Sequence, residues 1–176
     1  MQFPGLVLRV GIADIVRKGN RVVAGAGVSM ADLLKFASRE GLSGLEWAGG
    51  LPGTVGGAVR GNAGCFGGET KDSIISVRAL DMKTMKLVSL SRTRCAFGYR
   101  SSIFKKQDGR YVVVFATFKL KKGSLKDIRA SIAEKIRHRN ERHPLEYPNI
   151  GSMFKNVPWE ALPKKYQKEF AGRKKT

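Results

Sequence analysis

The sequence has few cysteines and no long apolar run. Only Cys65 and Cys95 occur in 176 residues, and their spacing fits no metal-binding or redox motif. We therefore expect two reduced thiols in a cytoplasmic protein, and no metal site. No stretch of about 18 apolar residues is present, and residues 1–10 lack the basic and apolar regions of a signal peptide. We expect no membrane partner.

Acidic side chains are also scarce. The chain has 14 Asp and Glu against 33 Lys and Arg, a formal net charge of +19. Such an excess suggests nucleic acid, but no uninterrupted basic block is longer than three residues. A positive protein can equally bind pyrophosphate and carboxylate groups. We therefore expect no nucleic acid as main partner. A basic nucleic-acid-binding module with residues 121–142 as its contact surface remains the alternative.

Hydrophobic patterning predicts a mixture of strands and helices, and hence an α+β fold. Alternating and β-branched segments predict strands at residues 6–10, 21–26, 74–82, 86–90 and 111–120. A further strand is expected to begin within residues 151–156. The short opening before residue 6 and the basic tail at 163–176 suggest that both ends are cut.

Two helices are expected from their caps and apolar spacing. Ser29 is a good N-cap for a helix that ends before Gly41 and turns Leu33, Leu34 and Phe36 toward a core. Ser124 caps the second helix, which must stop before Pro144. Its apolar stripe consists of Leu125, Ile128, Ile132 and Ile136.

The chain has 21 glycines, several of them clustered within residues 41–68. In the segment 49–58, Gly53, Gly56 and Gly57 leave the backbone bare, and consecutive N–H groups at a helix start can cradle a pyrophosphate. A glycine-rich turn that merely packs tightly is an equal alternative. The segment is neither GxGxxG nor GxxxxGK[ST], so the standard dinucleotide and P-loop motifs are excluded.

A second small-residue run follows at Asn62-Ala63-Gly64. An amide flanked by small residues suits contact with a flat ring, since Asn supplies both a donor and an acceptor. Taken alone, the run is equally compatible with a plain turn.

Several motifs in a fixed order resemble one family, the UDP-N-acetylenolpyruvoylglucosamine reductases. They are the segments 41–46, 51–58, 62–67, 97–104 and 143–156. The resemblance implies an FAD-binding domain of the vanillyl-alcohol oxidase/PCMH-like type in residues 1–122. Residues 123–176 are then a linking helix and the beginning of a substrate-binding domain.

The resemblance also implies a reaction. FAD, reduced by NADPH, passes hydride to the double bond of UDP-N-acetylglucosamine enolpyruvate and gives UDP-N-acetylmuramate for peptidoglycan synthesis. Arg100 matches the arginine that stabilises charge near the substrate carboxylate, and Ser152 matches the serine proton donor. Substrate contacts are implied for Tyr99, Lys155 and Asn156. The implied FAD contacts are Gly53, Thr54, Val55, Gly56, Gly57, Ala58, Asn62, Ala63 and Gly64.

Compared with the family pattern, two parts are missing. The first is an earlier glycine-rich turn, which also holds the FAD phosphates in the family. The second is a glutamate near the family's C-terminus. Neither has a counterpart in this sequence. We therefore expect a truncated, monomeric reductase acting on a UDP-sugar enolpyruvyl ether. A non-catalytic remnant and another FAD oxidoreductase of the same superfamily remain alternatives.

Overall fold

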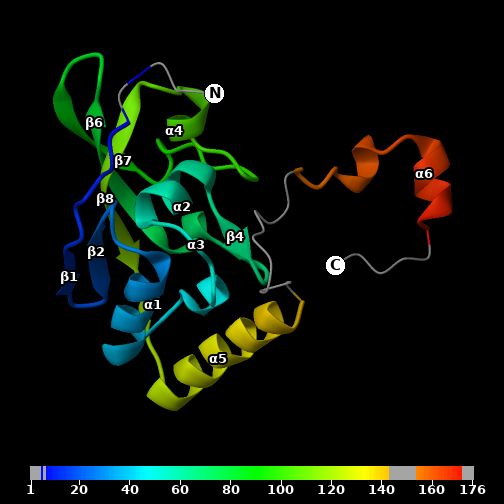
Figure 1. The fold of residues 1–176 in the computed structure, drawn as a ribbon, viewed down its shortest axis with the longest axis horizontal. Helices are drawn as coiled ribbons and strands as arrows, with labels where there is room; N and C mark the ends of the chain where they lie inside the picture. The colour runs from blue at the N-terminus through cyan, green and yellow to red at the C-terminus, as the bar shows by residue number, and fades with distance from the viewer. Residues whose placement is uncertain (1–4, 6, 143–153, 172–176) are drawn as a thin grey trace. The chain divides into compact units, whose positions relative to one another are not determined.

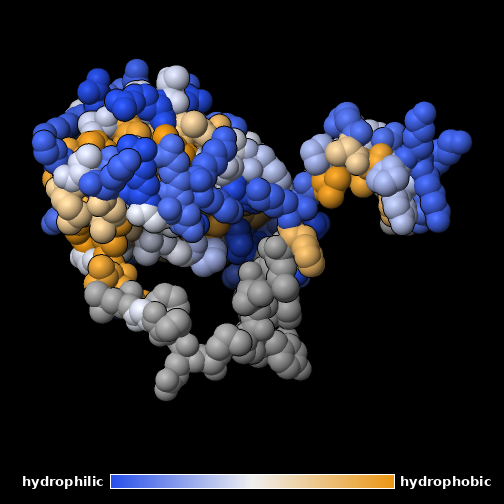
Figure 2. Space-filling view, turned by 90° about the horizontal axis from the view of Figure 1, so that it is seen from above, coloured by the Kyte–Doolittle hydropathy of each residue, from blue (hydrophilic) through white to orange (hydrophobic). Residues whose placement is uncertain are grey.

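The computed structural model describes residue 5 and residues 7–142 and 154–171. The chain forms two compact units, Met1–His143 and Pro144–Thr176. The first unit holds the sheet and the main hydrophobic core. Figure 2 shows hydrophilic residues over most of its visible face, with smaller groups of hydrophobic residues between them.

The centre of the first unit is a five-stranded antiparallel sheet (Figure 1) with the strand order β1-β2-β8-β6-β7. Its strands are β1 (Ile15–Lys18), β2 (Arg21–Gly25), β6 (Ile74–Asp81), β7 (Lys86–Ser91) and β8 (Tyr111–Lys119). The central strand β8 is rich in β-branched and aromatic residues, which favour a pleated, half-buried surface. The predicted strands near residues 21, 74, 86 and 111 are confirmed.

Helices cover one face of this sheet. Helix α2 (Val55–Gly61) packs on β2 and β8, and α1 (Met30–Arg39) and α5 (Leu125–Arg142) pack against each other beside it. Both predicted long helices are therefore confirmed. Ser29 caps α1 as predicted, with its hydroxyl accepting a hydrogen bond from the Asp32 N–H. The glycine at 41 follows α1 with φ +63°, the left-handed conformation that glycine adopts without strain.

Several short elements were not predicted. They are β3 (Leu42–Ser43), η1 (Glu46–Ala48), β4 (Gly64–Cys65), β5 (Gly68–Glu69), α3 (Thr70–Ser73), α4 (Ile103–Lys106) and β9 (Lys121–Lys122). Each spans two to four residues, which is too short for a periodic pattern to show in sequence. The pairs β3–β9 and β4–β5 each form a small two-stranded sheet.

The strand predicted at residues 6–10 is wrong for the residues that the structure describes. Residues 7–10 form no strand, and Val7 and Leu8 are each 78% exposed. The first strand instead begins at Ile15, where pairing with β2 is available. An apolar run adopts a strand only where a neighbouring strand offers hydrogen bonds, and this run has none at positions 7–10.

The apolar stripe predicted for α5 is only partly buried. Ile128 is buried, but Leu125 and Ile136 remain 45% and 39% exposed. The helix packs on η1 and α1. These two elements cover less of its apolar stripe than a sheet would. Because of these contacts α5 lies in the first compact unit. The functional division of the chain at residue 122 stays a prediction.

The second unit contains η2 (Trp159–Ala161) and α6 (Lys164–Glu169). The Gln167 side-chain amide donates hydrogen bonds to the carbonyls of Trp159 and Leu162, which joins the two. Of the strand expected within residues 151–156, positions 151–153 lie outside the described residues. Positions 154–156 are not a strand, so that expectation is wrong for the part that can be compared.

Candidate cofactor site

A cavity of about 510 Å³ opens beside the N-terminal end of α2. Its walls come from the start of α2, the loop after β2, the extended segment before β1, α4 and the first residues of β8. The residues that the argument below uses are Arg9, Gly27, Thr54, Gly56, Gly57 and Arg60. A cavity of this size is in the range of small-molecule sites, about 300–1,000 Å³.

The glycine-rich turn at the start of α2 combines both alternatives left open by the sequence. Thr54 caps the helix, and its hydroxyl accepts a hydrogen bond from the Gly57 N–H at 3.3 Å. A Cβ on Gly56 would lie 3.0 Å from the Ala26 Cβ, so this glycine packs tightly. Gly57 is exposed and lines the cavity. Thr54, Gly56 and Gly57 are thus brought to the cavity.

Two N–H groups of the expected phosphate cradle are already bonded within the chain. Val55 N–H donates to the Val28 carbonyl at 2.8 Å, and Gly56 N–H donates to the Ala26 carbonyl at 2.9 Å. These bonds fasten α2 to the loop after β2. These two N–H groups therefore serve packing within the chain, and the predicted FAD contacts of Val55 and Gly56 stay a prediction. Among the described residues that line the cavity, Gly53, Val55 and Ala58 do not occur.

The loop after β2 passes very close to the extended segment before β1. A Cβ on Gly27 would lie 2.5 Å from the Val10 carbonyl oxygen, closer than real Cβ atoms approach. Gly27 N–H donates to the Ile12 carbonyl at 2.9 Å. The absent side chain at Gly27 therefore lets this segment form one wall of the cavity.

Two arginines that sequence reasoning missed also line the cavity. Arg60 forms an ion pair with Asp108 at 2.7 Å, and its carbonyl accepts a hydrogen bond from the Ser102 hydroxyl. The Arg60 hydrogen bond lowers the pKa of the Asp108 carboxyl. Arg9 is the second cation of the lining. No spacing rule marks either residue, because they reach the cavity from segments distant in sequence.

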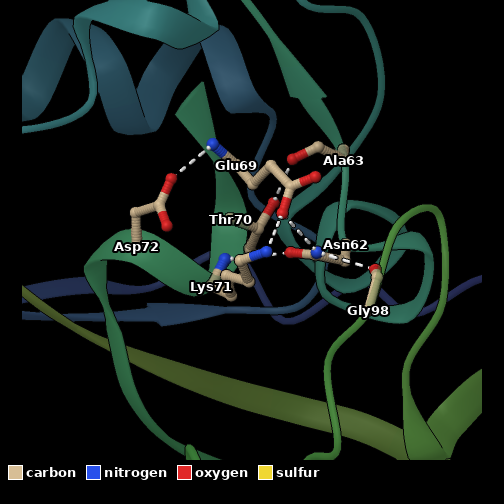
Figure 3. A network of polar contacts seen from close by, with 7 residues as sticks. All are labelled: Asn62, Ala63, Glu69, Thr70, Lys71, Asp72 and Gly98. Carbon is tan, nitrogen blue, oxygen red and sulfur yellow. Dashed lines mark hydrogen bonds and ion pairs between the residues drawn. The ribbon is translucent and has the colours of Figure 1, made fainter. Parts of the chain in front are cut away.

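The Asn62 side chain belongs to a hydrogen-bond network inside the protein. Its side chain is fully buried, and its backbone is left-handed with φ +45° at the C-cap of α2. The amide nitrogen donates to the Glu69 carboxylate at 3.0 Å and to the Gly98 carbonyl at 2.9 Å, as Figure 3 shows. The amide oxygen accepts from the Lys71 N–H at 3.0 Å. Both donors and the acceptor are thus used inside the protein.

The two small residues after Asn62 also pack inside the protein. The Ala63 carbonyl accepts hydrogen bonds from the N–H and the hydroxyl of Thr70 (Figure 3). A Cβ on Gly64 would lie 2.7 Å from the Gly68 carbonyl oxygen, since β4 and β5 approach closely there. The described lining of the cavity includes none of residues 62–64. Their predicted FAD contact stays a prediction.

The Glu69 carboxylate at the centre of this network is held in its charged form. Burial tends to raise the pKa of this carboxyl, but hydrogen bonds from Lys71 and Asn62, with the charges of Lys71 and Arg100, outweigh it. The pKa is therefore lowered. The Lys71 ammonium lies 2.5 Å from the carboxylate.

Arg100 lies at the tip of a tight turn. Gly98 and Ser101 exchange two backbone hydrogen bonds of 2.9 and 3.1 Å, so Tyr99 and Arg100 occupy the two central positions. Arg100 has φ +51°, a conformation that costs a non-glycine residue about 1–3 kcal/mol. Its guanidinium lies 5.5 Å from the Tyr99 ring centroid. Tyr99 is 47% exposed. The turn therefore presents Arg100 and Tyr99 together, at the cost of backbone strain.

Helix α5 adds further positive charge near this turn. Burial raises the pKa of the Cys65 thiol, against the opposing charges of Arg139, Arg100 and Lys135. Arg139 also lies over the Phe66 ring, 5.9 Å from its centroid. Helix α5 contacts η1, and η1 contacts β4, which brings Lys135 and Arg139 near Cys65.

The remaining predicted site residues lie in or near the second unit. Ser152 falls outside the described residues. Lys155 and Asn156 are described and exposed. Among the described residues, no group of three or more His, Cys, Asp or Glu could hold a metal ion, and no helix is both long and apolar enough to cross a lipid bilayer.

Known proteins match this chain over most of its length. It is 44% identical over 142 residues to the UDP-N-acetylenolpyruvoylglucosamine reductase of Fervidobacterium nodosum, covering 81% of this chain and 45% of that protein. It is 44% identical over 138 residues to the protein of the same name from Lachnoclostridium phytofermentans, covering 78% and 44%. The chain thus spans about half the length of these relatives.

A solved structure is similar too. The crystal structure of the UDP-N-acetylenolpyruvylglucosamine reductase from Thermus caldophilus aligns with a TM-score of 0.65 at 31% identity, covering 85% of this chain and 53% of that one. These matches confirm the resemblance and the α+β FAD-binding fold. The family model described as "FAD binding domain" matches residues 1–91, more than half of the 176 residues, and the chain therefore belongs to the FAD binding domain family.

Proposed function

We propose that this chain provides the FAD-binding body of a UDP-N-acetylmuramate dehydrogenase. The reaction is the NADPH-driven reduction of UDP-N-acetylglucosamine enolpyruvate in peptidoglycan precursor synthesis. The observation that carries the proposal is the 44% identity to reductases of that name through the segment that presents Arg100. The setting is cytoplasmic, the protein is a monomer, and the process serves cell-wall biogenesis and with it cell shape and division.

The cavity beside α2 fits part of an FAD molecule. Gly57 and Thr54 offer bare backbone and a hydroxyl, and Arg9 and Arg60 offer the positive charge that a pyrophosphate requires. A Cβ on Gly57 would come no closer than 3.7 Å to its nearest neighbour, the Thr54 hydroxyl, so the space in front of this glycine is open. Bound FAD would supply the two-electron chemistry, taking hydride from NADPH and delivering it to the substrate double bond.

Arg100 is proposed to stabilise the negative charge that develops in the substrate. Hydride addition to the enolpyruvyl double bond leaves electron density on the carbon next to the carboxylate. A guanidinium can hold that carboxylate with two parallel N–H bonds. The strained turn supports this role, because strained backbone is frequent where a side chain must be presented in one direction.

The proton is proposed to come from Ser152. Protonation of the carbanion completes the reduction, and a hydroxyl is a sufficient acid for so basic a carbon. Tyr99, Lys155 and Asn156 are proposed to contact the UDP-sugar enolpyruvyl ether.

The test uses a chimaera in which this chain replaces the matching region of the Fervidobacterium nodosum reductase. The chain alone is expected to bind FAD weakly, since it spans about half the length of its relatives. The chimaera should purify yellow and oxidise NADPH only with the enolpyruvyl substrate. Arg100→Lys should lower its turnover by about 10²-fold, as for loss of one oriented donor. The exposed Arg94, which lies six positions earlier, gives the control Arg94→Lys, which should keep turnover.

Two results would contradict the proposal. A yellow chimaera that oxidises NADPH at the same rate with and without the substrate would assign a different reaction. Near-normal turnover of Arg100→Lys would move the carboxylate contact to another residue.

A further inference from the structure

A second hollow, of about 580 Å³, lies at the opposite end of the central strand from the cofactor cavity. Val112 and Val113 of β8 line the cofactor cavity, whereas Lys119 and the following Lys121 line this hollow. At about 3.4 Å per residue, the seven positions from Val112 to Lys119 separate the two by roughly 24 Å. The hollow is therefore not part of the cofactor site.

Three strands align their cations at this end of the sheet. The register places Lys18 of β1 opposite Arg21 of β2, and Arg21 opposite Lys119 of β8. Directly opposite residues project from the same face of a sheet. The three basic side chains thus form one row, and like charges directly opposite each other destabilise a sheet. Arg92 and Lys121 add two cations where the row meets the hollow.

Little in the chain compensates this charge. None of the five cations takes part in an ion pair among the described residues, although the adjacent Arg17 pairs with Glu40. The acidic side chain in the wall is Asp72, and its carboxylate accepts the Glu69 N–H at 2.7 Å (Figure 3). All five cations are exposed. The cost of bringing them together is therefore not repaid within the described chain.

We propose that this hollow binds the oligophosphate group of a small ligand. Lys119 and Lys121 supply point charges, Arg92 supplies a planar fork of N–H donors, and the wall also contains the hydroxyls of Ser91 and Thr93. These are the donors that phosphate oxygens accept. The row through Arg21 and Lys18 extends the positive surface, so that a chain of several phosphates is favoured over a single one.

The geometry favours a compact ligand over a nucleic acid. The hollow has the volume of a small-molecule site, which suits a short chain of phosphates. The proposal does not depend on the proposed reductase activity, since none of these residues lines the cofactor cavity.

The experiment titrates the chain with inorganic tripolyphosphate and, separately, with ATP, by calorimetry. The hollow variant combines Arg92→Gln, Lys119→Gln and Lys121→Gln. The matched control combines Lys83→Gln, Lys106→Gln and Lys126→Gln, which removes the same charge from exposed positions elsewhere. Tripolyphosphate should bind the unmodified chain saturably. The hollow variant should bind it about tenfold more weakly or worse, because three charge-assisted contacts are lost, and the control should bind within about twofold of the unmodified chain.

Each outcome decides the proposal. If ATP behaves like tripolyphosphate, a nucleoside triphosphate is the source of the phosphates; if only tripolyphosphate binds, the source is inorganic, and both results support the site.

Equal loss in the hollow variant and the control would overturn it, because net charge alone would then explain binding. The absence of saturable binding would also overturn it. So would a single-stranded oligonucleotide that binds while tripolyphosphate and ATP do not. Urea midpoints of both variants would show that they fold.

Discussion

Next to α2, the buried Asn62 amide finds all its partners within the chain. At the other end of the sheet, none of the five cations Lys18, Arg21, Arg92, Lys119 and Lys121 forms an ion pair among the described residues. Around Asn62, each donor and acceptor of the amide is used, and the Glu69 carboxylate has its own cation. Lys119 of β8, in contrast, lies directly opposite another cation, Arg21 of β2. The first arrangement stabilises the fold, whereas the second lowers stability and raises the local positive potential. The network around Asn62 thus serves the fold, whereas the cations around Lys119 form a surface suited to an anionic ligand.

The largest expected loss of stability comes from breaking the hydrogen-bond network around Asn62. Asn62→Leu should lower the free energy of unfolding by about 2–4 kcal/mol, because it leaves the Gly98 carbonyl and the Lys71 N–H buried and unpaired and forces a branched residue into a left-handed backbone. Urea denaturation measures this. Asn140→Leu on the exposed face of α5 is the control and should change little. Equal midpoints for both variants would show that the network contributes nothing.

A smaller loss is expected where the cavity wall passes Gly27. Gly27→Ala places a Cβ 2.5 Å from the Val10 carbonyl oxygen, so the segment must shift, at about 1–3 kcal/mol. Gly61→Ala is the matched control. A Cβ there meets nothing within 4 Å, and the helix should gain about 0.5–1 kcal/mol. Thermal unfolding of the two variants should therefore move in opposite directions, and a shift of the same sign would contradict the close packing at Gly27.

Relieving the cation row should stabilise the protein slightly. Lys119→Thr removes the charge opposite Arg21 and should raise the free energy of unfolding by about 0.2–1 kcal/mol. Lys86→Thr removes a cation that lies opposite Asp81 in the neighbouring pair, so it should lower stability by a similar amount. Denaturant midpoints at low salt measure both. If Lys119→Thr also destabilises, the row is not strained.

The smallest expected effect is on the pH dependence of stability, through the Glu69 carboxylate. Since the pKa of Glu69 is lowered on folding from its ordinary 4.5, its contribution is fully present above that value and is lost as pH falls through the lower folded pKa. Glu69→Gln should therefore flatten the loss of stability as pH falls below about 4.5, and Glu134→Gln on α5 is the control for removing one carboxylate. The effect is small because burial opposes the shift. Parallel pH profiles for the unmodified chain and Glu69→Gln would contradict it.

The sequence predicted the elements whose pattern is local. Strand β8 and helix α1 follow from their own residues, β-branched in one and capped by Ser29 in the other. The strand predicted at residues 6–10 was misplaced because an alternating apolar run looks like a strand in sequence whether or not another strand lies beside it. The first strand that forms is β1, which begins at Ile15 because β2 lies beside it and offers hydrogen bonds.

The candidate site was predictable only in part. The glycine turn is marked by its own bare backbone, whereas the Arg100 segment is marked only by its resemblance to known reductases. The structure brings Thr54, Gly56 and Gly57 to one cavity. The partners of Asn62 could not be foreseen, since Gly98 lies 36 residues away in sequence. The same holds for Arg60, whose ion-pair partner Asp108 is 48 residues away. Long-range contacts of this kind leave no trace in spacing.

The hydrogen bond from Asn62 to Gly98 also sets the unit that must be kept together in protein engineering. It joins the turn that carries Arg100 to the segment that follows α2. A transplant of residues 51–64 alone would leave the amide without the Gly98 carbonyl and the Glu69 carboxylate. The smallest exchangeable part is therefore discontinuous in sequence. It comprises α2 through α3 together with the turn at 97–101.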